Sequence, residues 1–427
     1  MRLLKTRREQ ERFLGILAAR AAGPGREIES TVRKILDEVR REGDRAVLRY
    51  TKKFDWEKTN RLAVSRREIS SSADKAGRKV IRALAVAARR IRAFHERQRE
   101  RSWTVSSQGS ALGQIIRPLN RVGVYVPGGK ASYPSTVLMN AIPALVAGVK
   151  EIALCVPMPG GQMNPAVMAA IRLLDIAEVY RIGGVQAIGA LAYGTESIGH
   201  VDKIVGPGNI YVATAKKMVF GSVDIDMIAG PSEILVIADS SANPAFVAAD
   251  LLAQAEHDEL ASSVLVTDSS ALANAVRREI DAGLSRLGRE SIARRSLEAY
   301  GGIFVTAGVE ESVAIANRIA PEHLEIMTRR PSRLLPQIRN AGAIFLGRWT
   351  PEALGDYAAG PNHTLPTGGT ARFSSPLGVY DFVKRSSVVR FSKKGFLALA
   401  DTVKTIADAE GLEAHGYAVR VREGRAR

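Results

Sequence analysis

The stretch RVGVYVPGGKASYPSTVLMNAIPALVAGVKEIALCVPM, residues 121–158, indicates the fold class. It begins with a short apolar strand at 122–126 and continues through a Pro/Gly turn into an apolar helix around 134–148. A second apolar strand follows at 151–158. Apolar strands separated by helices are typical of parallel sheets that helices cover on both faces. The sequence therefore predicts an α/β protein.

The alternation of strand and helix continues far beyond this stretch. Apolar runs of strand length recur at 178–184, 203–209, 233–239, 262–268, 301–307, 324–328 and 341–347. This rhythm predicts doubly wound parallel sheets, with a seam between two units around Gly230, Pro231 and Ser232. Residues 1–110 are expected to be mostly helical, and residues 395–427 to form a helix and a basic tail.

The composition is that of an ordinary globular protein. The chain has 427 residues, enough for two to four domains, with 46% hydrophobic and 25% charged residues. Cys155 is the only cysteine, so an intrachain disulfide is excluded, which fits a reducing compartment. The N-terminal apolar run is too short for a secretory signal, and the most apolar region is too short and too interrupted to span a bilayer. We expect a soluble cytoplasmic protein.

The positive charge is concentrated in one part of the chain. The net charge is +17, and residues 1–101 hold 29 Lys and Arg against 14 Asp and Glu. Such a surface could attract nucleic acid or another polyanion. No zinc-finger, RNP-like or basic-zipper motif accompanies it, so a solvated helical face is the favoured interpretation.

A helix predicted to end near residue 257 carries the first candidate site residues. Asn243 can cap this helix and Pro244 fits its first turn. In its last turn, LLAQAEHDE (251–259), Gln254 and His257 are three residues apart and project to one side. Further along the chain, Asp356 adds a carboxylate in LGDYAAGPNH. Two imidazoles and a carboxylate are a common zinc ligand set, although sequence separation alone leaves open whether these groups meet.

The other histidines differ in context. His95 lies on the basic helix and His200 in a loop, where surface or structural roles are favoured. His363 lies in GPNHTLPTGG and His415 in EGLEAH. PEHLE places Glu322 beside His323, and such a pair can take protons from an alcohol and from water, or it can simply be a polar turn at a helix end.

Several glycine turns could bind a ligand, although each turn alone is more often a plain connection between elements. The turns at 126–130, 182–189 and 206–209 follow apolar strands, where open α/β sheets bind ligands, whereas AGPSE (229–233) leads into one. None has the GxGxxG pattern with a following acidic residue, so a dinucleotide would bind in a non-standard way. Cys155 suggests a competing thiol mechanism of aldehyde oxidation, but it lies in an apolar strand and a buried structural role is favoured.

Taken in order, the motifs resemble the histidinol dehydrogenase family over essentially the full length. The resemblance rests on RVGVYVPGGKASYPSTVLMNAIPA, GGVQAIGALAYGT, VDKIVGPGN, IDMIAGPSE, LLAQAEHD, PEHLE, GPNHTLPTGGTARFSSPLGVYDF and AEGLEAH. It implies two Rossmann-like domains with small helical segments at both ends, in an intertwined homodimer. The implied boundaries are residues 1–22 for an N-terminal helical segment, 23–120 with 233–376 for a first domain carrying the metal and catalytic residues, 121–232 for a second domain carrying the NAD contacts, and 377–427 for a C-terminal arm. The basic N-terminal quarter is not explained by the family pattern.

The resemblance also implies a reaction and its residues. L-histidinol would be oxidised to L-histidinal and then to L-histidine, with two NAD reduced. Zinc, one ion per subunit, would anchor the substrate rather than activate water. His323 would be the general base, and Glu322 would activate water. Zinc would be bound by Gln254, His257, Asp356 and His415. The substrate would contact these four residues and also Ser232, His323, His363 and Glu410. NAD would contact Tyr125, Gln186 and Asn209. His415 and Glu410 would come from the partner chain.

Three alternatives remain open at the level of sequence. One is a paralogue of the same fold acting on another alcohol, such as a sulfonated diol. Another is a zinc hydrolase in which Glu322 is the base for a zinc-bound water. The third is a polyanion-binding protein that uses the basic quarter and binds in a salt-dependent way.

Overall fold

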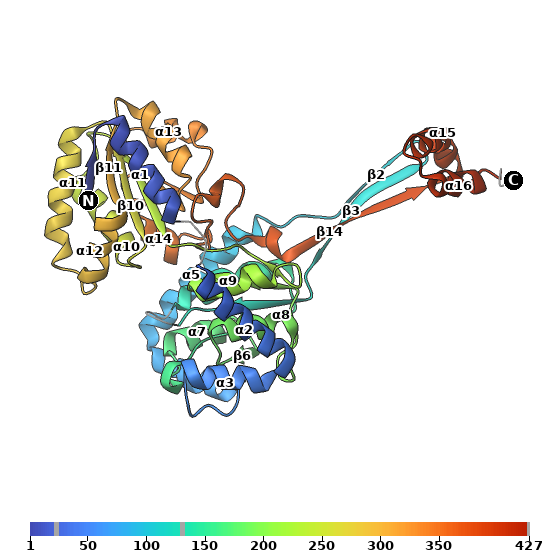
Figure 1. Cartoon of the computed structure of the whole chain (residues 1–427), viewed down its shortest axis with the longest axis horizontal. Helices are drawn as coiled ribbons and strands as arrows, with labels where there is room; N and C mark the ends of the chain where they lie inside the picture. Colours follow the sequence, from blue (N-terminus) through green and yellow to red (C-terminus); the bar gives the residue numbers. More distant parts are fainter. Residues whose placement is uncertain (21–24, 129–132, 425–427) are drawn as a thin grey trace. The chain divides into compact units, whose positions relative to one another are not determined.

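The computed structural model describes residues 1–20, 25–128 and 133–424. The chain divides into two compact units, which are described separately. Unit 1 consists of Met1–Gln98 and Leu119–Phe382, and unit 2 of Arg99–Pro118 and Val383–Arg427. The expected α/β fold is confirmed in unit 1, which holds two parallel sheets with helices on their faces (Figure 1). No helix in the described ranges is long and apolar enough to cross a membrane.

The first sheet of unit 1 has six parallel strands. Their spatial order is β1 (Arg2–Leu4), β11 (Gly301–Val305), β10 (Ser262–Thr267), β9 (Glu233–Ala238), β12 (His323–Met327) and β13 (Ala343–Leu346). Without β1, the strands in chain order give the arrangement 3-2-1-4-5 of a doubly wound sheet. The direction of winding therefore changes between β9 and β12.

Alternate residues of β9 explain how helices cover both faces of this sheet. Ile234 and Val236 pack in one apolar cluster with α10 (Pro244–Ala255), α11 (Ser270–Leu284) and α12 (Glu290–Tyr300). Leu235 and Ile237 pack in another with α1 (Arg7–Arg20) and α13 (Val309–Ile319). A strand that is apolar at every position is buried on both faces, as the sequence pattern indicates.

The second sheet of unit 1 repeats the same strand order. It runs β6 (Glu178–Tyr180), β5 (Glu151–Cys155), β4 (Arg121–Tyr125), β7 (Lys203–Val205) and β8 (Asp224–Ile225), all parallel. One face packs with α6 (Pro134–Ala147) and α7 (Pro165–Leu173), the other with α8 (Gly184–Tyr193) and α9 (Ile210–Val219). Its direction of winding changes between β4 and β7, so ligands are expected beyond the carboxyl ends of these two strands.

The N-terminal helices correct one expected boundary. Residues 23–120 were expected in the same domain as 233–376. Instead α2 (Arg26–Glu42) and α3 (Asp44–Phe54) pack in one apolar cluster of the second sheet, and α4 (Arg66–Ala73) and α5 (Arg78–Glu96) in the other. The apolar stripe of α2 at 32, 35, 36 and 39 shows that a helix buries one face, but spacing does not say against which neighbour.

Unit 2 is a three-stranded antiparallel sheet followed by two helices. Its order is β14 (Val383–Phe391), β3 (Ser110–Pro118) and β2 (Trp103–Ser107), with α15 (Lys393–Ala409) and α16 (Glu413–Arg422) after β14. Residues 103–110 were expected to be helical and this was wrong. Gln108 and Gly109 both have positive φ, 48° and 82°, and turn β2 into β3 as a tight hairpin. The C-terminal arm was predicted from 377 onward. Unit 2 instead begins at Val383 in this part of the chain and includes residues 99–118 as well.

Several shorter elements complete the chain. One helix, α14 (Glu352–Tyr357), follows β13, and six 3-10 turns lie at Asp74–Ala76, Pro159–Gly161, Pro331–Arg333, Leu335–Gln337, Thr370–Arg372 and Val379–Phe382.

Candidate active site

The amino ends of β9 and β12 bring the predicted catalytic pair together with Ser232. His323 is the first residue of β12 and Glu322 precedes it, while Ser232 precedes β9. The two strands are neighbours in register, with His323 opposite Ile234. These residues therefore lie at the edge of the sheet opposite to the one where open α/β sheets usually bind ligands. Open α/β sheets usually bind ligands beyond the carboxyl ends of their strands. The glycine turns of the second sheet lie at such ends, but this site does not.

His323 is held in one tautomer. Its Nδ1 lies 2.9 Å from the backbone oxygen of Glu233, and because a carbonyl oxygen only accepts, Nδ1 carries the hydrogen. Its Nε2 is buried without a hydrogen-bond partner among the described residues and lies 3.7 Å from Oδ1 of Asp356. Burial lowers the pKa of His323 to about 3, so the imidazole is neutral at physiological pH. The side chain is thus a proton acceptor with a free lone pair.

Glu322, like His323, is held by the backbone of Glu233. Its Oε2 accepts a hydrogen bond of 2.9 Å from the backbone N–H of Glu233. Burial raises the pKa of Glu322 well above its ordinary value, and the carboxyls of Glu233 and Asp356 add to the effect. A buried carboxyl with a raised pKa is a stronger base, once ionised, than an exposed glutamate.

Three side chains form a cluster that could hold a metal ion. His257, Glu352 and Asp356 have potential ligand atoms within 4.8 Å of one another. His257 lies beyond the end of α10, because the helix ends at Ala255, two residues earlier than the predicted last turn. Its neighbour Gln254 is fully buried, and only one orientation of its amide satisfies its contacts. In that orientation Nε2 donates to both carboxylate oxygens of Glu352, at 2.9 and 3.2 Å.

Glu352 is the site residue that sequence reasoning missed. It lies four residues before Asp356, so both carboxylates project from one face of α14. The spacing of four residues between Glu352 and Asp356 is the sequence feature from which this pair could have been predicted. Burial raises the pKa of Asp356 to about 7 and that of Glu352 well above its ordinary value, and burial lowers the pKa of His257. A divalent cation would favour the ionised carboxylates and the neutral imidazole, which is the chemistry this donor set suits.

His363 and Ser232 lie near the same strands. Nδ1 of His363 is 3.0 Å from the backbone oxygen of Asp356, and burial lowers the pKa of this imidazole to about 4. The backbone oxygen of Ser232 accepts from Ser262 and from Arg20, and its side chain is half-buried. Glu410 and His415 belong to unit 2. They lie at the end of α15 and in α16, and both are exposed.

The predicted NAD contacts lie at the carboxyl edge of the second sheet. Tyr125 ends β4, and its hydroxyl accepts a hydrogen bond of 3.1 Å from the backbone N–H of Gly184. Gln186 is 1% exposed, and its amide has no partner among the described residues. Asn209 is exposed and caps α9 after β7. Of the turn at 126–130, residues 129 and 130 lie outside the described residues.

The location of Cys155 argues against thiol chemistry. The side chain is fully buried in β5, and burial raises the pKa of the thiol above its ordinary value. A reactive cysteine requires the opposite, an exposed thiolate. If the chain has the activity that the resemblance implies, Cys155→Ala should retain both of its oxidations, as measured by NADH formation from histidinol and from histidinal. Selective loss of the aldehyde step would support a thiol mechanism.

Comparison with known proteins gives a consistent family. The model of the family described as histidinol dehydrogenase matches residues 19–423. A histidinol dehydrogenase of Syntrophotalea carbinolica is 56% identical over 412 residues, covering 96% of each chain. One of Aquifex aeolicus is 55% identical over 99% of this chain and 100% of its own. The crystal structure of histidinol dehydrogenase from Elizabethkingia anophelis superposes with a TM-score of 0.92 at 38% identity, covering 99% of this chain and 97% of that one.

Proposed function

Because the chain belongs to the histidinol dehydrogenase family, an oxidoreductase family of histidine biosynthesis, we propose that it carries out the four-electron oxidation of L-histidinol to L-histidine with zinc and NAD. The observation that carries the proposal is the buried, unpartnered Nε2 of His323 beside Glu322 and the cluster of His257, Glu352 and Asp356. Family membership argues against the zinc hydrolase, and relatives named histidinol dehydrogenase at 55–56% identity favour histidinol over the alcohol of a paralogue. Binding of a polyanion by the basic quarter stays a prediction.

The first oxidation needs a base at the substrate hydroxyl. The lone pair of His323 Nε2 takes the hydroxyl proton as hydride leaves the same carbon, because Nδ1 already holds its own proton against Glu233. NAD would accept the hydride of each oxidation. The neutral state of His323 means that no proton must first be removed from the base.

The second oxidation needs water. Glu322 takes a proton from water as the water oxygen attacks the aldehyde carbon, and His323 returns the proton of the first oxidation to the former carbonyl oxygen. His323, neutral again, then removes a proton from the hydrate as the second hydride leaves. The burial of both side chains, 6% and 4% exposed, keeps bulk water away from the aldehyde. Ser232 and His363 would bind the substrate.

Zinc fits the residues at this site. We assign His257, Asp356 and the Oε1 of Gln254 as its ligands in this chain, since Glu352 holds the amide of Gln254 by its Nε2. When bound, zinc would anchor the imidazole and amino groups of histidinol and so fix the reacting carbon.

Replacing Glu352 tests this assignment without relying on turnover. We expect Glu352→Gln to weaken zinc binding by about 10- to 100-fold, because one of the two oxygens that accept from Nε2 of Gln254 becomes an NH2 donor and the negative charge is lost. Zinc retained after dialysis against a graded series of chelator concentrations measures the change. Glu279→Gln, at an exposed position of α11, is the control for loss of one charge. Equal zinc retention in both variants would remove Glu352 from the site.

The second sheet would bind NAD. Tyr125 is the last residue of β4 and Asn209 follows β7, and the direction of winding changes between these two strands. The buried amide of Gln186 has free donors and acceptors to offer.

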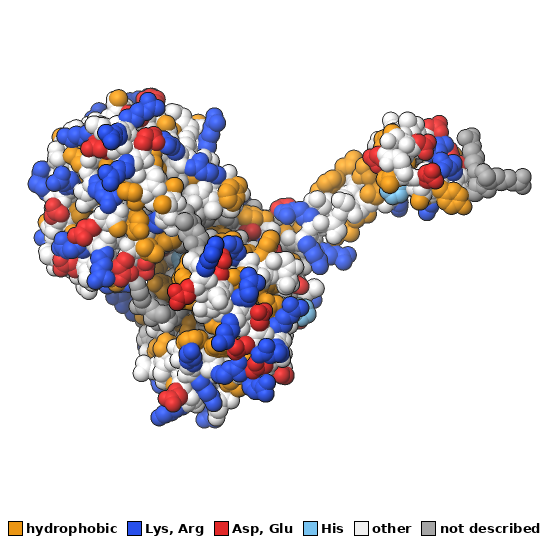
Figure 2. All heavy atoms as spheres, viewed as in Figure 1, with side chains coloured by type: hydrophobic (Ala, Val, Ile, Leu, Met, Phe, Trp, Pro, Cys, Tyr) orange, Lys and Arg blue, Asp and Glu red, His pale blue; other side chains and the backbone are white. Residues whose placement is uncertain are grey.

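A homodimer would complete the site. Unit 2 exposes apolar side chains along its strands and on its helices (Figure 2), among them Trp103, Val105, Val389, Leu397, Ile406 and Tyr417. Apolar surface of this extent favours a protein interface. We assign a second copy of the chain as the partner, with Glu410 and His415 reaching the substrate and the zinc of the other subunit.

One experiment tests the function as a whole. Purified enzyme with limiting L-histidinol and excess NAD is expected to form two NADH per histidinol. Chelation should abolish the activity and zinc should restore it. One NADH per histidinol would show that the aldehyde is released, and activity that survives complete zinc removal would contradict the metal assignment.

A further inference from the structure

We propose that Arg20 and Glu233 form a positioning pair for the catalytic residues: Arg20 holds Glu233, and the backbone of Glu233 holds Glu322 and His323. The inference rests on the proposed roles of Glu322 and His323. It adds to them an arginine from α1 that contacts neither side chain.

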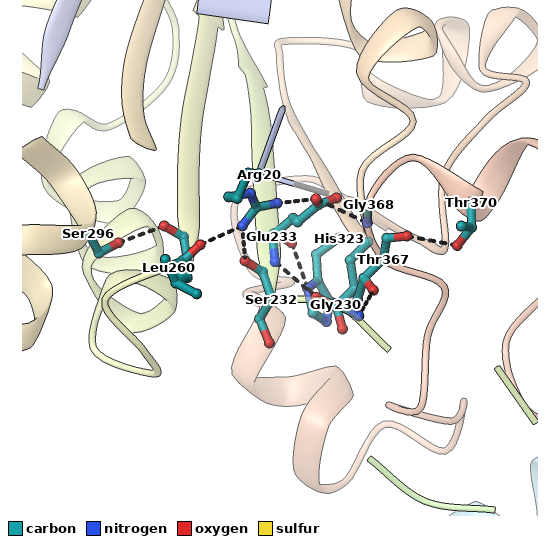
Figure 3. Close-up of polar contacts among 12 residues, drawn as sticks. Arg20, Gly230, Ser232, Glu233, Leu260, Ser296, His323, Thr367, Gly368 and Thr370 are labelled. Atoms are coloured by element: carbon teal, nitrogen blue, oxygen red, sulfur yellow. Dashed lines mark hydrogen bonds and ion pairs between the residues drawn. The ribbon is translucent and has the colours of Figure 1, made fainter. Parts of the chain in front are cut away.

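The backbone of Glu233 contacts the side chains of both proposed catalytic residues. Its N–H donates to Oε2 of Glu322 at 2.9 Å. Its carbonyl accepts from Nδ1 of His323, also at 2.9 Å (Figure 3). The first contact orients the carboxyl that activates water, and the second sets the tautomer of the base. A small rotation or shift of this one residue would misalign both groups together.

The side chain of Glu233 is anchored in the interior. It forms an ion pair with Arg20, and its Oε1 accepts a hydrogen bond of 3.1 Å from the backbone N–H of Gly368. The two charged side chains are only 2% and 7% exposed. Gly368 belongs to the segment that also carries His363, which we propose binds the substrate. The carboxylate of Glu233 is therefore hydrogen-bonded to this segment.

Arg20 connects three chain segments through its guanidinium. Besides Glu233, it donates to the backbone oxygen of Ser232 at 3.3 Å and of Leu260 at 2.6 Å. These acceptors lie at the start of β9 and shortly before β10 (Figure 3). A planar guanidinium can serve several acceptors in fixed directions, which the single ammonium group of lysine cannot.

Positioning explains this pair better than stability does. Burying two charges costs solvation free energy that their attraction roughly offsets, so such a pair adds little net stability. Placement of catalytic groups, by contrast, tolerates little error, and a shift of about 1 Å can cost about 100-fold in rate. Arg20 and Glu233 support the backbone that holds Glu322 and His323, and catalytic side chains need such supporting contacts to stay in place.

The test replaces Arg20 by methionine, which keeps much of the length of the side chain and removes every donor. We expect kcat for histidinol to fall about 10- to 100-fold while KM changes by less than about threefold, because positioning and not substrate contact is lost. Arg318→Met is the matched control. It removes the exposed pair with Glu11, which also joins α1 to the rest of unit 1, and should leave kcat unchanged.

A spectroscopic readout separates positioning from loss of folded enzyme. With ¹⁵N-labelled histidine, the Nδ1–H of His323 should be protected from exchange in the wild-type protein and lost or fast-exchanging in Arg20→Met. The Nδ1–H of His95, which donates to Gln98 at 2.8 Å, should persist in both and reports on the fold. Arg20→Lys, which restores one donor, is expected to recover part of kcat and part of the protection.

Each outcome counts for or against the pair. Normal kcat and a normal His323 signal in Arg20→Met would overturn the proposal. If that variant does not fold, Glu233→Gln, which keeps the acceptor oxygen and removes the charge, should give the same combination of low kcat and near-normal KM, and unchanged kcat would again overturn it. If His323→Asn and Glu322→Gln both retain turnover, the proposed catalytic roles fail, whatever Arg20→Met does. If the wild-type enzyme forms no NADH from histidinol, the proposed function itself fails.

Discussion

Replacing His323 by asparagine is expected to lower turnover of histidinol by about 10²- to 10⁴-fold, the range that a general base contributes, while the zinc content stays unchanged. Asparagine can still donate to the carbonyl of Glu233 but has no lone pair of comparable basicity to replace the free Nε2. Both oxidations should be affected, because each removes a proton from oxygen. Steady-state NADH formation from histidinol and from histidinal measures the two steps.

The control for this variant is His200→Asn, which replaces an exposed imidazole. It should behave as the wild type. A His323→Asn enzyme with near-normal turnover would remove His323 as the base. A variant that lost its zinc would show instead that the imidazole supports the metal site, since Nε2 lies only 3.7 Å from Asp356.

The fold was largely predictable because its signal is local. The runs EILVIAD and SSVLVTD each contain consecutive apolar residues, at 234–238 and 264–266, and each run is followed by a helix, so parallel strands buried on both faces are indicated. The hairpin of residues 103–118 and the partners of α2–α5 were not predicted. A two-residue turn at Gln108 and Gly109 is a weak signal, and the packing partner of an apolar stripe is a long-range property.

The sequence named several residues of the candidate site but not how they are arranged. Motifs carried over from the family named His257, Asp356, Glu322 and His323, and the structure brings these four side chains of unit 1 together. Residues without a motif were missed. The only sequence feature that marks Glu352 is its position four residues before Asp356. Arg20 lies at the end of a helix, and nothing in the sequence indicates that the fold buries it beside Glu233.

Mixing two inactive variants is expected to restore activity if the site is shared between subunits. His323→Asn lacks the proposed base in unit 1, and His415→Asn lacks the proposed zinc ligand in unit 2. After random exchange, half of the dimers are mixed, and each mixed dimer has one site with both histidines intact. About a quarter of wild-type activity should therefore return, as expected for a twofold-symmetric dimer.

A second mixture shows whether the recovery comes from sharing. His323→Asn and Glu322→Gln alter neighbouring residues of one strand end, so every site in a mixed dimer keeps one defect and no activity should return. Native mass spectrometry of chains with different isotope labels confirms that subunits have exchanged. If the first mixture stays inactive despite confirmed exchange, His415 does not serve the site of the other subunit, and each chain must then complete its own site.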